Sequence, residues 1–376
     1  MKKLRLRITC ASILVVALWG LWLTDIVVLA ATPGAVTAAS AQTQALVTAT
    51  SAFLQSLSAA QRRQVQFAFT VDAPVTAAKF KGGMNGQMTF VGEQHGQAVW
   101  SNFPVSDVPR PGLKIGDLSV AQREAALHLL QVALSPKGYQ KILDIMGSDQ
   151  ALSESGTPFC SGTACYTIGI FGPPSATAPW MLQFGGHHLA LNITVSGERG
   201  VLTPALTGAQ PAVYTVNGKT VRALAQESDK AFALLAALDG AQRKQAILNY
   251  RVADLVLGPG HEGEAILPEG LKASAMNERQ RALLLDVISE WVGIINDTYA
   301  ASRLAEVRAG LDETYFAWSG PTTHEPGKNG AAYYRIQGPR VIIEFSPQGV
   351  GGDLTMHVHT VYRDPENDYG RSLTKQ

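Results

Sequence analysis

A helix-capping residue, followed three positions later by glutamine and then by arginine, occurs four times in this chain. The copies are Ser58-Ala-Ala-Gln61-Arg62, Ser119-Val-Ala-Gln122-Arg123, Asp239-Gly-Ala-Gln242-Arg243 and Asn277-Glu-Arg-Gln280-Arg281. In such a capping box, the first side chain and the glutamine side chain each accept a hydrogen bond from the other residue's backbone N–H. The pattern therefore predicts four helix starts. A diverged internal repeat would explain it, although the spacing is too uneven for a solenoid.

Runs with β character separate the helical blocks. The C-terminal third contains four of them, at residues 314–318, 331–336, 340–345 and 354–362. Because strands come in consecutive runs, the chain predicts an α+β fold with an antiparallel β-sheet core and several packed helices. Its length suits a single domain over residues 41–376, or two intimate lobes at about 41–155 and 156–376.

The first forty residues are expected to precede this fold. A basic start leads into an apolar run at 13–23 and then into small residues that suit cleavage, which is typical of an export signal. An uncleaved anchor over residues 8–31 is the alternative, but Asp25 opposes stable burial in lipid. We expect an extracytoplasmic protein, periplasmic or secreted, that meets a membrane only through this segment. A net charge of +1 without a basic run gives no reason to expect a nucleic-acid partner.

Cys160 and Cys165 lie in one short loop, Phe-Cys-Ser-Gly-Thr-Ala-Cys-Tyr. In an exported protein this spacing favours a local disulfide. A metal-binding or redox pair is the alternative, but the spacing matches no established motif. The expected role is local stability.

Two histidine pairs are the main candidates for a functional site. His357 and His359 alternate along the last strand and so point to one face, while His187-His188 follows two glycines and precedes a strand. Adjacent strand residues face opposite ways, so usually at most one of the latter pair serves the same site as the former. The metal-site hypothesis joins one or both of His187 and His188 to His357 and His359. Three imidazoles with an open fourth position suit zinc, copper or iron. A buried polar network and metal-free catalysis are the alternatives.

Four charged residues are candidates for acid–base or binding roles near this site. Asp364 or Asp368 would orient a histidine, Arg363 would hold an anionic substrate, and Glu344 lies mid-strand among apolar residues, where it needs a salt bridge or acts as a general base. The other interpretation is structural, because Arg-Asp and Asn-Asp sequences form ion pairs and turns that would lock the C-terminus.

Several segments, in this order, also carry a family resemblance. They are Trp100…Pro104…Arg110, Gly112-Leu113, Leu134-Ser135 with Gly138-Tyr139, Gly186-His187-His188-Leu-Ala-Leu-Asn192, Thr203-Pro204 with Gly208-Ala209, Phe316-Ala-Trp318-Ser-Gly320, and His357-Val-His359 with Arg363-Asp364-Pro365-Glu-Asn367-Asp368-Tyr369-Gly370. From about residue 45 onward the chain resembles the bacterial family called domain of unknown function 3500. The resemblance implies a shared fold and site without an established activity. The chain departs from the family where Arg-Ser-Leu-Thr-Lys-Gln replaces an expected histidine-bearing tail, which removes one possible ligand.

Two functional hypotheses follow. The first is an exported protein whose His-rich site binds a transition metal, for metal handling or for metal-assisted hydrolysis. The second is a metal-free extracytoplasmic module that binds a small organic ligand through Arg363 and aromatic residues. The chain lacks Gly-x-Ser-x-Gly, a phosphate-binding glycine loop and His-Glu-x-x-His, so it offers no support for the enzyme classes that those motifs mark.

Overall fold

The computed structural model describes residues 37–264 and 266–373. The expected export signal, and the alternative anchor at 8–31, lie outside the described residues. The described residues belong to one compact unit that begins at Thr37, and none of their helices is long and apolar enough to cross a membrane. Helix α1 (Ala38–Ser56) begins inside the segment expected to precede the fold, because the Thr37 hydroxyl accepts from the Ser40 N–H and caps it.

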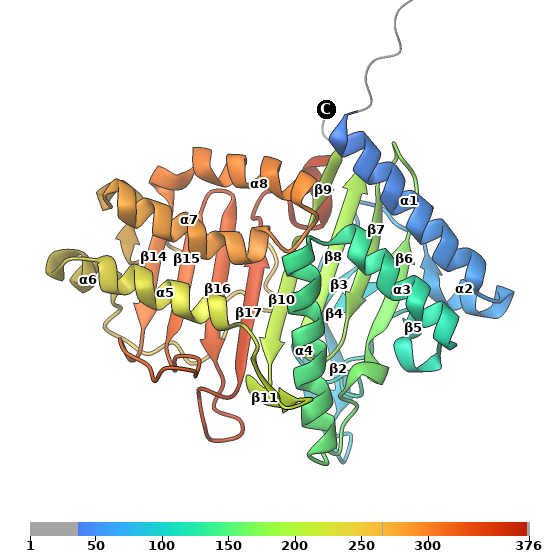
Figure 1. Cartoon of the computed structure of the whole chain (residues 1–376), viewed down its shortest axis with the longest axis horizontal. Helices are drawn as coiled ribbons and strands as arrows, with labels where there is room; N and C mark the ends of the chain where they lie inside the picture. Colours follow the sequence, from blue (N-terminus) through green and yellow to red (C-terminus); the bar gives the residue numbers. More distant parts are fainter. Residues whose placement is uncertain (1–36, 265, 374–376) are drawn as a thin grey trace, which may run out of the picture. The chain divides into compact units, whose positions relative to one another are not determined.

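A large sheet organises the described part of the chain (Figure 1). In spatial order its main path is β1 (Gln66–Phe67), β6 (Thr167–Phe171), β7 (Trp180–Gly185), β8 (Leu189–Ser196), β10 (Ala205–Ala209), β17 (Val358–Arg363), β16 (Val341–Pro347), β15 (Tyr333–Gly338), β14 (Tyr315–Ser319) and β13 (Leu271–Lys272). β5 (Leu113–Lys114) adds to β6, and β9 (Arg199–Val201) adds to β8. The strand pairs are antiparallel except β1 with β6. The predicted α+β class is confirmed.

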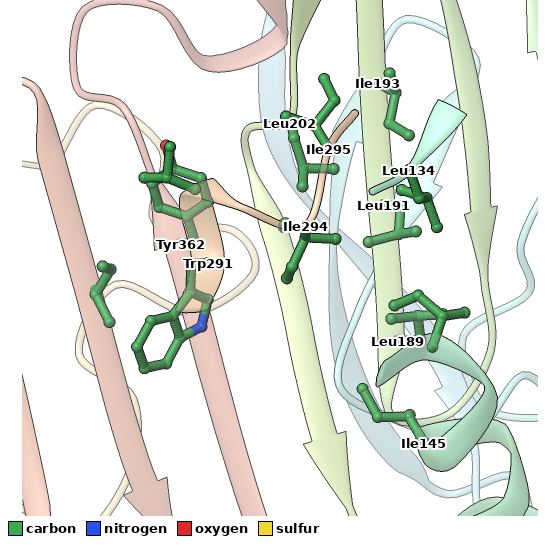
Figure 2. Packing of buried hydrophobic residues seen from close by; sticks show 14 of the residues in the cluster. Leu134, Ile145, Leu189, Leu191, Ile193, Leu202, Trp291, Ile294, Ile295 and Tyr362 are labelled. Carbon is green, nitrogen blue, oxygen red and sulfur yellow. The ribbon is translucent and has the colours of Figure 1, made fainter. Parts of the chain in front are cut away.

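Helices cover one face of this sheet (Figure 1). α1, α3 (Val120–Ala133) and α4 (Pro136–Glu154) lie over β6, β7, β8 and β10, whereas α5 (Ala225–Ala237), α7 (Glu278–Val292) and α8 (Asp297–Ala309) lie over the strands from β14 to β17. The helix-covered side holds the main apolar core. Figure 2 shows Trp291, Ile294 and Ile295 in the same cluster as Leu134 and Leu191.

The opposite face carries a smaller sheet made of β2 (Val75–Gly82), β3 (Met88–His95) and β4 (Ala98–Trp100). Trp100 of β4 belongs to a second buried cluster with Met181 of β7, Val361 of β17 and Tyr369. Because alternate residues of a strand share a face, Val361 and the other odd-numbered residues of β17 point into the layer between the two sheets.

A further hairpin, β11 (Val213–Val216) and β12 (Lys219–Arg222), leads from the first half of the large sheet toward α5.

All four predicted capping boxes are present, and they lie side by side in two pairs. They open α2 (Ala59–Val65), α3, α6 (Gly240–Ala246) and α7. Gln61 and Gln122 exchange amide hydrogen bonds of 3.2 and 3.0 Å, and Gln242 and Gln280 do the same at 3.0 and 2.7 Å. Each box is thus paired with another, once in each half of the sheet.

The two halves follow the same plan and meet at the β10–β17 pair. Each half contributes four consecutive antiparallel strands, and in each a segment after the short helix runs parallel to the first of them: β1 beside β6, and Ile247 beside Trp318. On the helical side, Leu134 and Ile295 form an antiparallel bridge between equivalent helix–helix connections. The arrangement supports a diverged internal repeat, and it places the two histidine pairs at the junction of the halves.

Candidate metal centre

The β7–β8 turn and the start of β17 bring the two histidine pairs together. Gly186 donates its N–H to the Leu189 carbonyl at 2.9 Å and closes the turn that carries His187 and His188. In the sheet register, His359 lies opposite Gly208 of β10. A Cβ atom at Gly208 would lie 3.2 Å from the Cδ2 atoms of both His188 and His359, so glycine leaves the space in which these rings meet.

Three imidazole Nε2 atoms converge at this point. His357 Nε2 lies 3.3 Å from His188 Nε2 and 3.1 Å from His359 Nε2. These three residues can each direct one nitrogen toward a common metal ion. With a zinc–nitrogen bond of about 2.05 Å, two ligand atoms of a tetrahedral site lie about 3.3 Å apart. The two separations that involve His357 are close to this value.

The hydrogen-bond partners of the Nδ1 atoms determine where the proton lies on two of these rings. His188 Nδ1 is 2.6 Å from Asp149 Oδ1, and His357 Nδ1 is 3.2 Å from the Val350 carbonyl oxygen. A carboxylate and a carbonyl only accept, so both Nδ1 atoms carry the proton and both Nε2 atoms present lone pairs when the rings are neutral. Two lone pairs that face each other at 3.3 Å repel unless a metal ion or a proton lies between them.

The third ring, His359, has Asn102 as its outer partner. The Asn102 side-chain nitrogen is placed 3.4 Å from His359 Nδ1. Rotating this amide by a half-turn presents its oxygen instead, which accepts from Nδ1–H and leaves His359 Nε2 unprotonated. The same site therefore has two proton arrangements: a hydrogen bond from His359 Nε2–H to His357 Nε2, or three lone pairs aimed at a metal.

Asp149 is the residue of this site that the sequence analysis missed. It lies on α4 and is fully buried. Its Oδ1 binds the His188 ring, and its Oδ2 accepts from the Tyr166 hydroxyl at 2.6 Å and from the His188 N–H at 3.3 Å. A sequence signal exists: Asp149 continues the apolar stripe formed by Ile142, Ile145 and Met146. A carboxylate on the core face of a helix indicates a buried partner.

His187 belongs to the same cluster but not to the three converging Nε2 atoms. Its ring stacks on that of His188 with centroids 3.7 Å apart, and its Nδ1, 3.9 Å from Asp149 Oδ1, has no hydrogen-bond partner among the described residues. Of this pair, His188 is the one that joins the three-histidine group with His357 and His359. The turn nevertheless keeps both rings on the same side, because His187 and His188 precede the regular part of β8.

Burial favours the neutral form of His187, His357 and His359. All four histidines are at most 6% exposed. Burial, reinforced by the neighbouring imidazoles, lowers the pKa values of His187 and His359 well below the ordinary range and that of His357 to about 4. Neutral histidine is the form that binds metals.

The metal-free protein should therefore lose stability in mild acid. Between pH 6.5 and about 4, unfolded His357 binds a proton that the folded state does not bind, so the free energy of unfolding falls as the pH drops through this window. For His357 the loss is on the order of 3 kcal/mol. Urea unfolding of chelator-treated protein at pH 7 and pH 4.5 measures it, and His357→Gln should show a smaller pH dependence. Equal dependence in the variant and the wild type contradicts this prediction.

The charged candidates on β16 and β17 have partners of their own. Glu344 accepts from the N–H groups of Val256 and Leu257 and from the Tyr333 hydroxyl. Asp364 pairs with Arg303 at 2.9 Å and Arg340 at 3.1 Å.

Arg363 and Asp368 form a second buried group, in which Glu93 of β3 was not foreseen. All five N–H groups of Arg363 are used, on both oxygens of Glu93, on Asp368 and on the carbonyls of Leu257 and Gly258. Burial raises the pKa of Asp368 to about 6 although the Arg363 charge opposes this. These contacts fit a C-terminal lock. A catalytic role for Glu344, Arg363, Asp364 and Asp368 stays a prediction.

The two loop cysteines are close to the histidine cluster. Cys160 and Cys165 form a disulfide, with Cα atoms 6.0 Å apart. The preceding residue, Phe159, packs edge-on against the His187 ring at 5.3 Å between centroids. Phe159, next to the disulfide, therefore covers one side of His187.

Comparison with protein families agrees with the resemblance drawn from the residues. The model of the family described as "Protein of unknown function (DUF3500)" matches residues 77–371, most of the chain. The chain belongs to this family. No curated protein and no solved structure matches it. The matched region of this DUF3500 protein contains every residue of the histidine cluster and Asp149, so the candidate centre lies within the family domain.

Proposed function

We propose that this DUF3500 protein is an extracytoplasmic metalloprotein that holds a transition metal ion, zinc in the first place, through the Nε2 atoms of His188, His357 and His359. The observation that carries the proposal is the convergence of these three Nε2 atoms, with the Nδ1 atoms of His188 and His357 directed at two acceptors, Asp149 and the Val350 carbonyl. A metal ion between the Nε2 atoms would be bound by the lone pairs that the neutral rings direct at it. Copper and iron also accept imidazole ligands, but the tetrahedral spacing favours zinc.

Metal-assisted hydrolysis suits this site better than metal transport or storage. Three neutral imidazoles leave a fourth position for a reacting molecule, and a metal ion at such a position lowers the pKa of bound water and polarises carbonyl groups. The protein residues hold the ligands in place: Asp149 and the Val350 carbonyl fix two rings, and all three are buried. Rigid, buried ligands favour a resident ion over one that must be released to another molecule.

Export remains part of the proposal. Its support is the N-terminal segment described above and the disulfide between Cys160 and Cys165, a bond that persists in oxidising compartments. The alternative of a metal-free ligand-binding module loses its main feature, because Arg363 has no N–H group left for a ligand.

The experiment that tests the proposal is a zinc titration of chelator-stripped protein, monitored by calorimetry and by metal analysis after gel filtration. One equivalent of tightly held zinc per chain is expected. Hydrolysis of a panel of activated carboxylic and phosphate esters, measured with stripped and zinc-loaded protein, then tests the reaction class. A chain that retains no zinc overturns the metal site, and a loaded chain without zinc-dependent turnover overturns the hydrolytic role.

Asp149→Asn should weaken zinc binding by about 10- to 100-fold while the fold is kept. Asparagine keeps one acceptor for His188 Nδ1–H, but its NH₂ group replaces the oxygen that receives the Tyr166 hydroxyl and the His188 N–H. Competition with a chromogenic chelator measures the affinity. Asp144→Asn on the same helix is the matched control, because Asp144 bonds to Gln140 at the surface. Equal affinities in the two variants contradict the role of Asp149.

A further inference from the structure

We infer that the metal-loaded centre also holds a small oxyanion, of the carboxylate class, beside Arg110 and His187. The inference rests on the proposed function, because the metal brings most of the charge that the anion balances. It adds a ligand class and two residues that the three-histidine set does not use.

Arg110 is buried, and among the described residues it forms no ion pair with a carboxylate. Its side chain is 8% exposed, and its Nη atoms donate to backbone carbonyls, those of Ser101, Phe103, Val108 and Gly186. Within the described part of the chain, its Nε–H has no hydrogen-bond partner. Carbonyl oxygens satisfy the N–H groups but do not neutralise the charge, which is costly to leave buried.

Arg363 provides a comparison within the same protein. It is 3% exposed, and it pairs with two carboxylates, Glu93 and Asp368, while every one of its N–H groups is bonded. The two buried arginines thus differ in both charge and hydrogen-bond satisfaction. Arg363 thus has carboxylate partners and a full set of hydrogen bonds within its own chain, whereas Arg110 has neither among the described residues.

His187 follows the residue whose carbonyl Arg110 contacts, and it has a second nitrogen without a partner in the described residues. The Gly186 carbonyl accepts from Arg110 Nη2 at 3.2 Å, which ties Arg110 to the residue before His187. His187 is 6% exposed, and no residue that the structure describes forms a hydrogen bond with its Nδ1. Arg110 is close enough that its charge adds to the effects, led by burial, that lower the pKa of His187. An oxyanion can accept from Arg110 Nε–H and from a protonated His187 Nδ1 of the neutral ring.

The charge balance gives the reason for an anion. A divalent metal ion and Arg110 bring three positive charges, the imidazoles bring none, and Asp149 brings one negative charge, so two positive charges remain in a buried site.

The test uses the full chain loaded with Co²⁺, whose visible absorption reports its ligands. Sodium acetate is titrated at constant ionic strength, with sodium perchlorate as the weakly coordinating control. A saturable spectral change with acetate alone is expected. Arg110→Met should raise the acetate dissociation constant by about 10- to 100-fold, whereas Arg110→Lys, which keeps the charge, should raise it less. His187→Phe, which keeps the stacked ring, serves if Arg110→Met does not fold, and it should also weaken acetate binding.

The outcomes separate the two proposals. If Co²⁺ binds at one equivalent and acetate leaves its spectrum unchanged, the anion site is overturned and the metal site stands. The anion site is also overturned if acetate binds equally well to the wild type and to the folded Arg110 or His187 variants. If no Co²⁺ binds, the metal site fails first and the anion site fails with it.

Discussion

Replacing both His357 and His359 with alanine should abolish stoichiometric zinc binding, the largest effect expected of any change in this protein. The two substitutions remove two of the three converging Nε2 atoms and leave His188 as the remaining member of the set. Loss of a residue that only supports a ligand weakens metal sites by about 10- to 100-fold, so loss of two direct ligands should lower affinity well beyond 100-fold. Metal analysis of wild-type and variant protein after identical loading and gel filtration measures the result.

The matched control replaces two histidines outside the cluster, His128 and His261, with alanine. Both are exposed, and they lie on α3 and in the loop before β13. This control should keep one equivalent of zinc, and far-ultraviolet circular dichroism should show that both double variants are folded. A folded His357→Ala, His359→Ala protein that keeps its zinc would place the metal elsewhere.

Arg363→Met should lower the free energy of unfolding by about 3–5 kcal/mol, which is the second large effect. The substitution leaves the buried carboxylates of Glu93 and Asp368 without their cation and removes five hydrogen bonds that join β17, β3 and the loop at residues 257–258. Arg363 also lies over the Trp100 ring, with its guanidinium carbon 5.4 Å from the ring centroid. Urea unfolding at pH 7 measures the change.

Arg281→Met is the control for this effect. Arg281 pairs with Asp312 where both side chains are substantially exposed, so its loss should cost less than about 1 kcal/mol. Similar losses in the two variants would refute the assignment of Arg363 as a structural lock. The folded fraction of Arg363→Met should still bind zinc, because the Arg363 bonds lead away from the three Nε2 atoms. Failure of the folded variant to bind zinc would instead connect Arg363 to the metal site.

Local features of the fold were readable from the sequence. The four capping boxes depend on residues three positions apart, and strands β14 to β17 show in short runs of alternating or β-branched residues. The last strand starts later than predicted, at Val358, because residues 349–357 form the turn that supplies the Val350 carbonyl to His357. The pairing of the boxes across each half was not readable, since it depends on which helices become neighbours.

The sequence by itself determined the residue types of the candidate site, which are two histidine pairs. One pair alternates along a strand, and the other follows two glycines. The tertiary structure decided which of them meet. His188 and His357 are 169 positions apart, and Glu93 and Arg363 are 270 apart. The first contact follows from the antiparallel β10–β17 pair, which joins the two halves of the large sheet, and the second from the packing of the small sheet on the large one. Asp149 enters for the same reason, because α4 packs over the strands that carry the histidines. Periodicity and capping act between near neighbours in the chain, whereas the donor set of a metal site depends on strand order and layer packing.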